Sequence, residues 1–333
     1  MGKLDPKNLE KLLKCVKADS RVVVPPMLGY DSGVHWIGDK WLVVSTDPCI
    51  GVPEKWFGWL LIHYAASDVA IFGAKPQFCT INLLGPPETK PKTFQKIMRQ
   101  VCETAEELDI AIVTGHTGTY NGLSTLVGVC TAYGTVEKEK LKTPGNAKPE
   151  DLIVCTKPLG LEIAINLALI NRDLAEKIFG VKRTRRLRKL ITVQSCVREA
   201  LALAEIDGVH AMHDLTEGGL TASLNEMAEA SKLGFKIEFE KIPICPEAYK
   251  LKEAYKLSEN QLLSMSSTGT ILIAVNPQAQ GKVKETLTRH NLEPHFLGVF
   301  TRDGKRVLLK NGREKAFPNR AEDPYGRILS GAV

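Results

Sequence analysis

The sequence predicts a two-domain protein of the α/β (α+β) class. Two blocks of mixed strand and helix patterns flank the segment KTPGNAKPED at 142–151, which has two prolines, one glycine and almost no apolar periodicity. The chain has 333 residues, more than one hydrophobic core usually organises, and 44% of them are hydrophobic. We therefore expect a first domain over residues 1–142 and a second over residues 150–333.

The first block begins with a helix that Asp5 caps and that has Pro6 in its first turn. A strand pair then turns at Gly38 and Asp39, and a helix over about 56–72 ends at Gly73. The remaining patterns are a strand at 78–85, an amphipathic helix at 92–109, and strands at 110–115 and 123–136. Because strands and helices do not alternate strictly, the order disfavours a doubly wound sheet.

The second block is again a mixture of helices and strands. A buried strand is expected at 268–275, and the strand patterns PHFLGVFT and KRVLLK at 294–310 are expected to close the domain as a pair. The other expected elements are strands at 151–157, 208–213 and 235–240, and helices through 160–205, at about 218–231 and at 277–290. The domain is therefore predicted to be α+β.

The net charge of +6 is concentrated in the run KRTRRLRK at 182–189, which holds six basic residues and no acid. Without this run the chain is neutral, so a domain-wide basic face for nucleic acid is not indicated. Leu187, Leu190, Ile191 and Val197 can line one helical face while the arginines face water. We favour this solvated helix face over a patch that binds phosphate or RNA.

The eight cysteines include no C-x-x-C pair of the zinc or redox kind. Several lie in apolar runs and should be buried as small hydrophobic residues, which suits the reducing cytosol. The N-terminus lacks the apolar core of a signal peptide. The longest apolar stretch, at 59–74, contains His63 and Asp68 and is too short to cross a bilayer. We therefore expect a cytoplasmic protein without a membrane segment.

The stretch MHDLTEGGL at 212–220 places Asp214, Thr216 and Glu217 before a glycine pair, between a predicted strand and a predicted helix. Asp214 or Thr216 could cap the helix. Capping leaves Gly218 and Gly219 unexplained, because each costs about 1 kcal/mol of helix stability relative to alanine. The glycines suggest a close approach to backbone, so a cap and a ligand-binding loop both stay open.

Three further acidic residues lie beside glycines or at predicted strand ends: Asp31 in LGYDSGV, Asp47 in VVSTDPCIG and Asp68 in AASDVAIFGAKP. Asp47 precedes Pro48, where its strand should stop. Asp68 lies in an apolar helix, where an unpaired carboxylate costs several kcal/mol, so we expect it to have a partner. Each alone is better explained as a turn or cap residue, although this explanation is weaker for Asp68, and together they permit one magnesium–nucleotide site.

The segment TGHTGTYNG at 114–122 carries three glycines after a predicted strand. It could cradle phosphates with backbone N–H groups or form a plain glycine turn. Other phosphate-binding and hydrolytic signatures are missing from the sequence, namely G-x-x-x-x-G-K-[ST], G-x-S-x-G and H-E-x-x-H. Those enzyme classes are disfavoured.

The ordered set GYDSGV, STD, ASDVAIFGAKP, TGHTG, MHDLTEGGL and SSTGTILIAV resembles the superfamily of aminoimidazole ribonucleotide (AIR) synthetase, also called PurM-like. That superfamily includes the hydrogenase-maturation protein HypE, thiamine-monophosphate kinase and selenophosphate synthetase. The resemblance extends from about residue 25 to residue 300, and the HypE branch looks most similar. It implies an N-terminal mixed-sheet domain that dimerises through its sheet, a C-terminal α+β domain, and Mg-ATP bound in the cleft between them.

The resemblance also implies roles for individual residues. Asp31, Asp47 and Asp68 match the family's magnesium and phosphate-site carboxylates, and Gly115, Thr117 and Gly118 would lie beside the nucleotide. Thr216, Gly218 and Gly219 would bind the nucleotide from the C-terminal domain. Asp214, Glu217 and His116 are the candidate catalytic residues.

Two departures from the family pattern bear on activity. The family's G-G-D-T is here Thr114, Gly115, His116 and Thr117, so His116 replaces a metal-site aspartate. HypE proteins end in a cysteine that receives a carbamoyl group, whereas this chain ends GRILSGAV with no cysteine after Cys245. We therefore do not expect thiocyanate synthesis on the protein's own tail.

The chemistry that the resemblance implies is activation of an oxygen or selenium atom by ATP. In the synthetase and HypE branches an amide oxygen takes the γ-phosphoryl group and then leaves as phosphate. The first hypothesis is thus a dimeric Mg-ATP-dependent enzyme acting on an amide- or carbonyl-type oxygen, in a small molecule or a protein tail. The alternatives are a nucleotide-binding partner or scaffold that is not catalytic and, more weakly, nucleic-acid binding through residues 182–189.

Overall fold

The computed structural model describes residue 4 and residues 6–331, and this part of the chain divides into two compact units. The N-terminal unit comprises residues 13–141. The C-terminal unit comprises the chain from Lys142 onward together with the residues up to Leu12. The predicted cap Asp5 lies outside the described residues, and helix α1 (Pro6–Leu13) begins directly after it.

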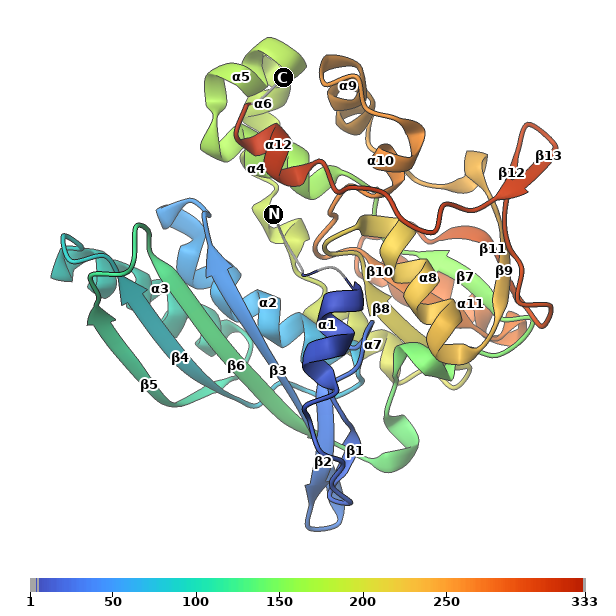
Figure 1. The fold of residues 1–333 in the computed structure, drawn as a ribbon, viewed down its shortest axis with the longest axis horizontal. Coiled ribbons are helices and arrows are strands. Elements are labelled where there is room, and N and C mark those ends of the chain that lie inside the picture. The colour runs from blue at the N-terminus through green and yellow to red at the C-terminus, as the bar shows by residue number, and fades with distance from the viewer. Residues whose placement is uncertain (1–3, 5, 332–333) are drawn as a thin grey trace. The chain divides into compact units, whose positions relative to one another are not determined.

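The described strands of the N-terminal unit form one sheet in the order β1-β2-β3-β6-β4-β5, and α2 and α3 cover one of its faces (Figure 1). Neighbouring strands are antiparallel except β4 and β5, which are parallel. The strands are β1 (Val22–Val24), β2 (Gly33–Ile37), β3 (Lys40–Ile50), β4 (Phe78–Gly85), β5 (Ala111–Thr119) and β6 (Val127–Val136), and the helices are α2 (Phe57–Ile71) and α3 (Pro91–Glu107).

Helix α2 is the centre of the N-terminal unit. Every residue in it except Tyr64 is buried, so it is apolar on all sides rather than amphipathic. In β6 buried and half-buried residues alternate along the whole strand, because successive side chains point to opposite faces of the sheet. One face of the sheet therefore packs against the helices, and the other carries half-buried and exposed side chains.

Several predicted elements of this unit are confirmed, and two strand limits are corrected. The hairpin turns at Gly38 and Asp39, with Gly38 at a φ of 62°. However, β3 does not stop at Asp47 but continues to Ile50. Proline has no N–H to donate, and Pro48 is tolerated because it lies beyond the pairing of β2 with β3, which ends at Val44. On that edge of β3 no neighbouring strand needs a hydrogen bond from residue 48. Strand β5 likewise continues beyond residue 115 to Thr119.

The described strands of the C-terminal unit form a second sheet in the order β13-β12-β9-β11-β7-β10-β8. The predicted closing pair, β11 and β12, is not a pair, because β9 lies between them: β12 runs parallel to β9 and β11 antiparallel to it. The strands are β7 (Leu152–Cys155), β8 (Val209–Asp214), β9 (Gly234–Glu238), β10 (Ile271–Val275), β11 (His295–Thr301), β12 (Arg306–Lys310) and β13 (Arg313–Ala316).

Helix α8 packs on one face of this sheet through Leu220, Leu224 and Met227, which join the main hydrophobic cluster of the unit. Helices α7 and α11 contact each other, and α7 also contacts β8. The helices of the unit beyond α1 are α4 (Leu161–Ile170), α5 (Arg172–Phe179), α6 (Val181–Leu187), α7 (Val197–Ala204), α8 (Gly219–Ser231), α9 (Pro246–Ala254), α10 (Glu259–Leu263), α11 (Gln280–Arg289) and α12 (Tyr325–Leu329).

The basic run at 182–189 lies in α6 and the residues that follow it. The predicted continuous helix is interrupted after Leu187, although Leu187, Ile191 and Val197 are buried as expected. Most of the basic side chains are exposed, and Arg183 forms an ion pair with Glu247. This arrangement agrees with a solvated face.

Six of the eight cysteines are buried, and all eight are free thiols, as expected for small hydrophobic residues. Among the described residues, no helix is both long enough and apolar enough to cross a membrane.

Candidate functional site

Asp68 has the partner that its position in an apolar helix required. The residue is 4% exposed, and the hydroxyl of Ser45 donates a hydrogen bond of 2.7 Å to its Oδ2 atom. Ser32 also donates to the backbone carbonyl of Asp68, at 3.0 Å. Because Ser32 comes from the loop before β2 and Ser45 from β3, Asp68 is the point at which two distant segments meet α2.

These two segments carry the other predicted carboxylates of the N-terminal unit. Asp31 precedes Ser32 and is half-buried, while Asp47 lies two residues beyond Ser45 in β3 and is also half-buried. Residues two apart in a strand share a face, so Asp47 points to the side of the sheet that carries α2. Burial raises the pKa of the neighbouring Cys49 thiol, and the Asp47 carboxylate raises it further. The predicted carboxylate segments thus converge within one unit.

Gly115 and Gly118 of TGHTG lie inside β5, so the expected plain turn is wrong, while the phosphate contact stays a prediction. A Cβ atom at Gly115 would lie 2.2 Å from the backbone oxygen of Ile81 in β4, so only glycine allows the two strands to approach so closely. Thr117 is exposed, and Gly118 is half-buried. The structure explains Gly115 by strand packing.

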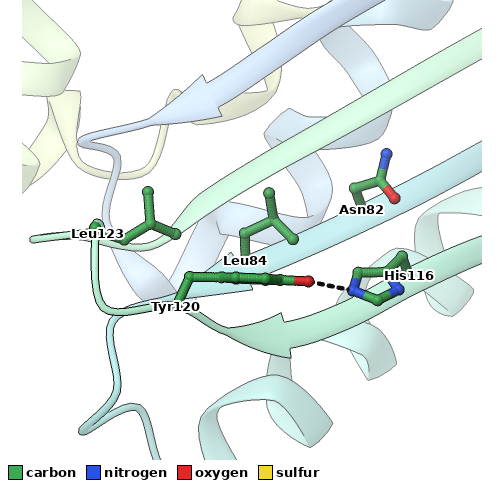
Figure 2. Close-up of a pocket in the computed structure, with 6 residues that line it drawn as sticks. Asn82, Leu84, His116, Tyr120 and Leu123 are labelled. Carbon is green, nitrogen blue, oxygen red and sulfur yellow. Dashed lines mark hydrogen bonds between the residues drawn. The ribbon is translucent and has the colours of Figure 1, made fainter.

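His116 lines a pocket of about 440 Å³ on the face of the sheet that α2 and α3 do not cover. Its Nε2 atom lies 2.6 Å from the hydroxyl oxygen of Tyr120, and Figure 2 shows the Tyr120 ring extending along the strand toward it. Glycine at position 118 leaves room for the Tyr120 ring, because a Cβ atom on residue 118 would lie 3.3 Å from that ring. The other lining residues are Gly122, the third glycine of the segment 114–122, and four residues that the sequence interpretation missed: Asn82, Leu84, Tyr120 and Leu123.

In the C-terminal unit, neither Asp214 nor Thr216 caps α8, so the capping interpretation is wrong. The N-cap position is Gly218 in the left-handed conformation, with a φ of 85°. Asp214 is instead the buried last residue of β8, and the Ser223 hydroxyl donates to its backbone carbonyl at 2.7 Å. Thr216 contributes its carbonyl, which accepts the N–H of Gly219 at 2.9 Å.

Gly219 is explained by a close approach of backbone, as predicted, whereas Gly218 is explained by its left-handed φ of 85°. Gly219 has a φ of 51°, and a Cβ atom on it would lie 2.4 Å from the carbonyl oxygen of Met265. The segment 264–270, which joins α10 to β10, therefore lies directly against the turn at 216–219. Ser267 N–H also donates to the Leu215 carbonyl at 2.7 Å, which fixes the two segments together.

His213 and Asp323 are two residues of this region that the sequence interpretation missed. His213 is 1% exposed, with Nε2 at 2.9 Å from Glu226 Oε2 and Nδ1 at 3.3 Å from Asp214 Oδ1. Asp323 accepts a hydrogen bond of 3.1 Å from Gly218 N–H, and Ser266 donates to the same Oδ2 atom. No local motif signals Asp323, which lies 105 residues from Gly218.

Glu162, also missed, is a buried carboxyl beside this segment. Its Oε2 atom accepts a hydrogen bond of 2.8 Å from the Thr268 N–H, and Glu162 is 6% exposed. Burial raises the pKa of Glu162 from its ordinary 4.5 to about 7; the charges of Asp323 and Glu217 add to that rise, and hydrogen bonds from Thr268 oppose it. This carboxyl therefore titrates near neutral pH.

We predict that Glu162 makes the protein less stable as the pH rises. The folded state holds this proton more tightly than the unfolded chain, so the contribution is fully present below pH 4.5 and is lost toward pH 7. Its size is on the order of 3 kcal/mol. Urea titrations across this range should show the unfolding free energy of Glu162→Gln rising relative to wild type as the pH increases. A difference independent of pH would contradict the prediction.

Comparisons with known proteins match both units to one family. The N-terminal domain of AIR synthase related proteins matches residues 29–136, and their C-terminal domain matches residues 148–310. A hydrogenase expression/formation protein of Methanocaldococcus jannaschii is 28% identical over 287 residues, covering 84% of this chain and 82% of that protein. A selenide, water dikinase of Yersinia pestis is 26% identical over 342 residues, covering 92% of this chain and 94% of that enzyme.

Among solved structures, Escherichia coli HypE superposes with a TM-score of 0.74. The alignment has 24% sequence identity and covers 86% of this chain and 88% of HypE. The likeness confirms the two-domain fold that the resemblance implied.

Proposed function

Because this chain belongs to the family of AIR synthase related proteins, we propose that it is a Mg-ATP-dependent enzyme. In this proposal it works in the cytosol and transfers a phosphoryl group to an amide- or carbonyl-type oxygen of a small molecule or a protein tail. The observation that carries the proposal is the meeting of the Asp31 and Asp47 segments at buried Asp68. The relation to a dikinase, an enzyme named for phosphoryl transfer, supports it.

The carboxylates of the N-terminal unit suit magnesium chemically, although the oxygens of Asp31, Asp47 and Asp68 do not all lie within 4.8 Å of one another. Carboxylate oxygens are the ligands that this hard cation takes, together with phosphate oxygens of a nucleotide. Asp31, Asp47 and Asp68 would hold the ion, and Ser45 orients the Asp68 carboxylate through its 2.7 Å hydrogen bond. When bound, magnesium would neutralise charge on the phosphates.

The C-terminal unit would supply neutral donors and the candidate proton carriers. Helix α8 begins at the turn 216–219, and a helix N-terminus favours anionic groups. Asp214 and Glu217 belong to this region, and buried His213 between two carboxylates extends the set of groups that could hold a proton. In the N-terminal unit, His116 is exposed and its tautomer is tied to the Tyr120 hydroxyl.

The proposal includes a homodimer formed through the N-terminal sheet. On the face opposite α2 and α3, the rings of Phe78 and Tyr133 stack with centroids 5.6 Å apart, and Phe78 is 41% exposed. Ile50, on the same face but six residues further along β3 from Val44, the partner of Tyr133, is 53% exposed. Such an apolar sheet face fits a second copy of the same surface. Light scattering should give twice the chain mass of 36.6 kDa; a monomer at micromolar concentration would contradict this part.

Calorimetry with ATP tests the core of the proposal. We expect saturable binding of ATP in the presence of magnesium and much weaker binding in EDTA, because the carboxylates need the cation to meet the phosphates. Phosphate release should then be screened against small amides, formyl compounds and ribonucleotides. Absence of saturable Mg-ATP binding would overturn the enzyme proposal.

One observation favours a second candidate, a nucleotide-binding partner without catalysis. His116 stands where the family pattern has an aspartate, and its imidazole is engaged with Tyr120. A His116→Asp variant separates the two functions. If the wild-type protein binds Mg-ATP and releases phosphate with a substrate, the partner hypothesis fails; if only the variant turns over ATP, it is supported.

A further inference from the structure

The C-terminal segment, defined here as residues 318–331, is held firmly on the C-terminal unit. It follows β13 and lies beyond residue 310, where the match to the family's C-terminal domain ends. Ile328 in α12 is fully buried. Hydrogen bonds reach the segment from three separate helices or their ends: Asn225 to Pro318 O (2.9 Å), Asn166 to the Tyr325 hydroxyl (3.0 Å) and Tyr255 to Ile328 O (3.2 Å).

Asp323 is the acidic residue through which this segment reaches the turn at 216–219. Its Oδ2 atom accepts from Gly218 N–H at 3.1 Å and from the Ser266 hydroxyl. Its Oδ1 atom accepts from Tyr325 N–H at 2.9 Å. One carboxylate therefore joins the start of α8, the segment before β10 and the start of α12.

The hydrogen bonds of Asp323 with Gly218 and Ser266, called the bridge below, fix the backbone of the turn at 216–219, which the proposed function uses. Gly218 is in a left-handed conformation at the start of α8, and the side chains of Asp214 and Thr216 do not cap it. A cap from within the turn would hold only the turn, whereas Asp323 holds the turn and Ser266 in one arrangement. Ser266 is 4% exposed, while Asp323 and Gly218 are half-buried, so the bridge is partly shielded from solvent.

We propose that Asp323 is a positioning residue of the Mg-ATP site, holding the Gly218 turn and Ser266 in register from the C-terminal segment. The proposal rests on the proposed function, because it assumes that the turn at 216–219 meets the nucleotide. Glu162 is a charged neighbour of the bridge and interacts electrostatically with both Asp323 and Glu217. Removing the Asp323 carboxylate frees the Gly218 N–H, the Ser266 hydroxyl and the Tyr325 N–H while leaving the turn residues unchanged.

The test compares Asp323→Ala, Asp323→Asn and Ser266→Ala by calorimetric titration with Mg-ATP. The dissociation constant should rise about 10-fold or more in Asp323→Ala, by less in Asp323→Asn, whose carbonyl can still accept one or both donors, and several-fold in Ser266→Ala. Amide exchange at Gly218 should accelerate in Asp323→Ala. The matched control is Glu322→Ala, the exposed neighbouring carboxylate, which should bind as wild type does.

A double-mutant cycle between Asp323 and Ser266 separates positioning from stability. If the bridge acts as a unit, Asp323→Ala should change affinity far less in the Ser266→Ala background than in wild type. If Asp323→Ala does not fold, Ser266→Ala alone decides, because wild-type affinity in that folded variant would overturn the proposal. Lower thermal stability with unchanged Mg-ATP affinity in the Asp323 variants would also overturn it. Failure of the wild-type protein to bind Mg-ATP would instead refute the proposed function.

Discussion

Replacing Asp47 or Asp68 with asparagine should weaken Mg-ATP binding by about 100-fold or more, equivalent to about 2.7 kcal/mol. Each change removes one negative charge from a set that is proposed to hold a divalent cation, and an amide is a poorer ligand for magnesium. Asparagine at 68 keeps the size of the side chain, and its carbonyl can still accept the hydrogen bond from Ser45. The fold should therefore persist in both variants.

Asp39→Asn is the matched control for this experiment. Asp39 lies in the exposed turn between β2 and β3, in the same unit as Asp47 and Asp68, and the substitution is chemically identical. Its affinity for Mg-ATP should equal that of wild type in the same calorimetric titration. Near-wild-type affinity in both Asp47→Asn and Asp68→Asn would place the magnesium ligands elsewhere.

Replacing Lys157 with methionine should lower the free energy of unfolding by about 3–5 kcal/mol, measured by urea titration. Lys157 is 7% exposed, and its ammonium group lies 2.6 Å from Glu199 Oε1. It also donates to the carbonyls of Val193 (3.0 Å), Ser195 (2.6 Å) and Gly269 (2.7 Å). Methionine leaves the Glu199 charge buried without its partner and three carbonyls without this donor.

Two further variants test whether the buried charge causes the loss. Lys157→Met combined with Glu199→Met should be more stable than Lys157→Met alone, because the second change removes the stranded carboxylate. Lys236→Met, which breaks the exposed ion pair with Glu314, should lose far less stability. Equal losses in Lys157→Met and Lys236→Met would show that burial of the pair is not what matters.

Local patterns were sufficient for most helices and for the alternating strands. The helix at 56–72 and the hairpin at Gly38 and Asp39 follow from apolar runs, glycine positions and turn chemistry, which are properties of neighbouring residues. The predicted ends of strands were wrong where pairing with a distant strand decides how far a strand extends. Pro48 predicted the end of a strand, but β3 continues because β6 pairs with it through Ile50. The closing pair failed because β9, some 60 residues earlier in the sequence than β11, inserts between β11 and β12.

The candidate site likewise contains residues that the sequence could identify and residues that it could not. Motif residues such as Asp68 and Gly219 could be selected from sequence, since a carboxylate in an apolar helix and a glycine at a helix start are unusual locally. Their partners could not. Ser45 lies 23 residues from Asp68, and nothing in its own surroundings marks it as the donor. The glycines of TGHTG were expected in a loop, because the sequence does not reveal how closely β4 and β5 approach.

The sequence by itself determined the mixed α/β class, the family resemblance and the acidic and glycine-rich segments proposed to bind Mg-ATP. Only the tertiary structure decided which residues hold those segments in place: Ser45 for Asp68, and Asp323 for Gly218. The physical reason is that helix and strand patterns arise from interactions a few residues apart. A hydrogen bond between residues 105 positions apart exists only after the chain has folded around it.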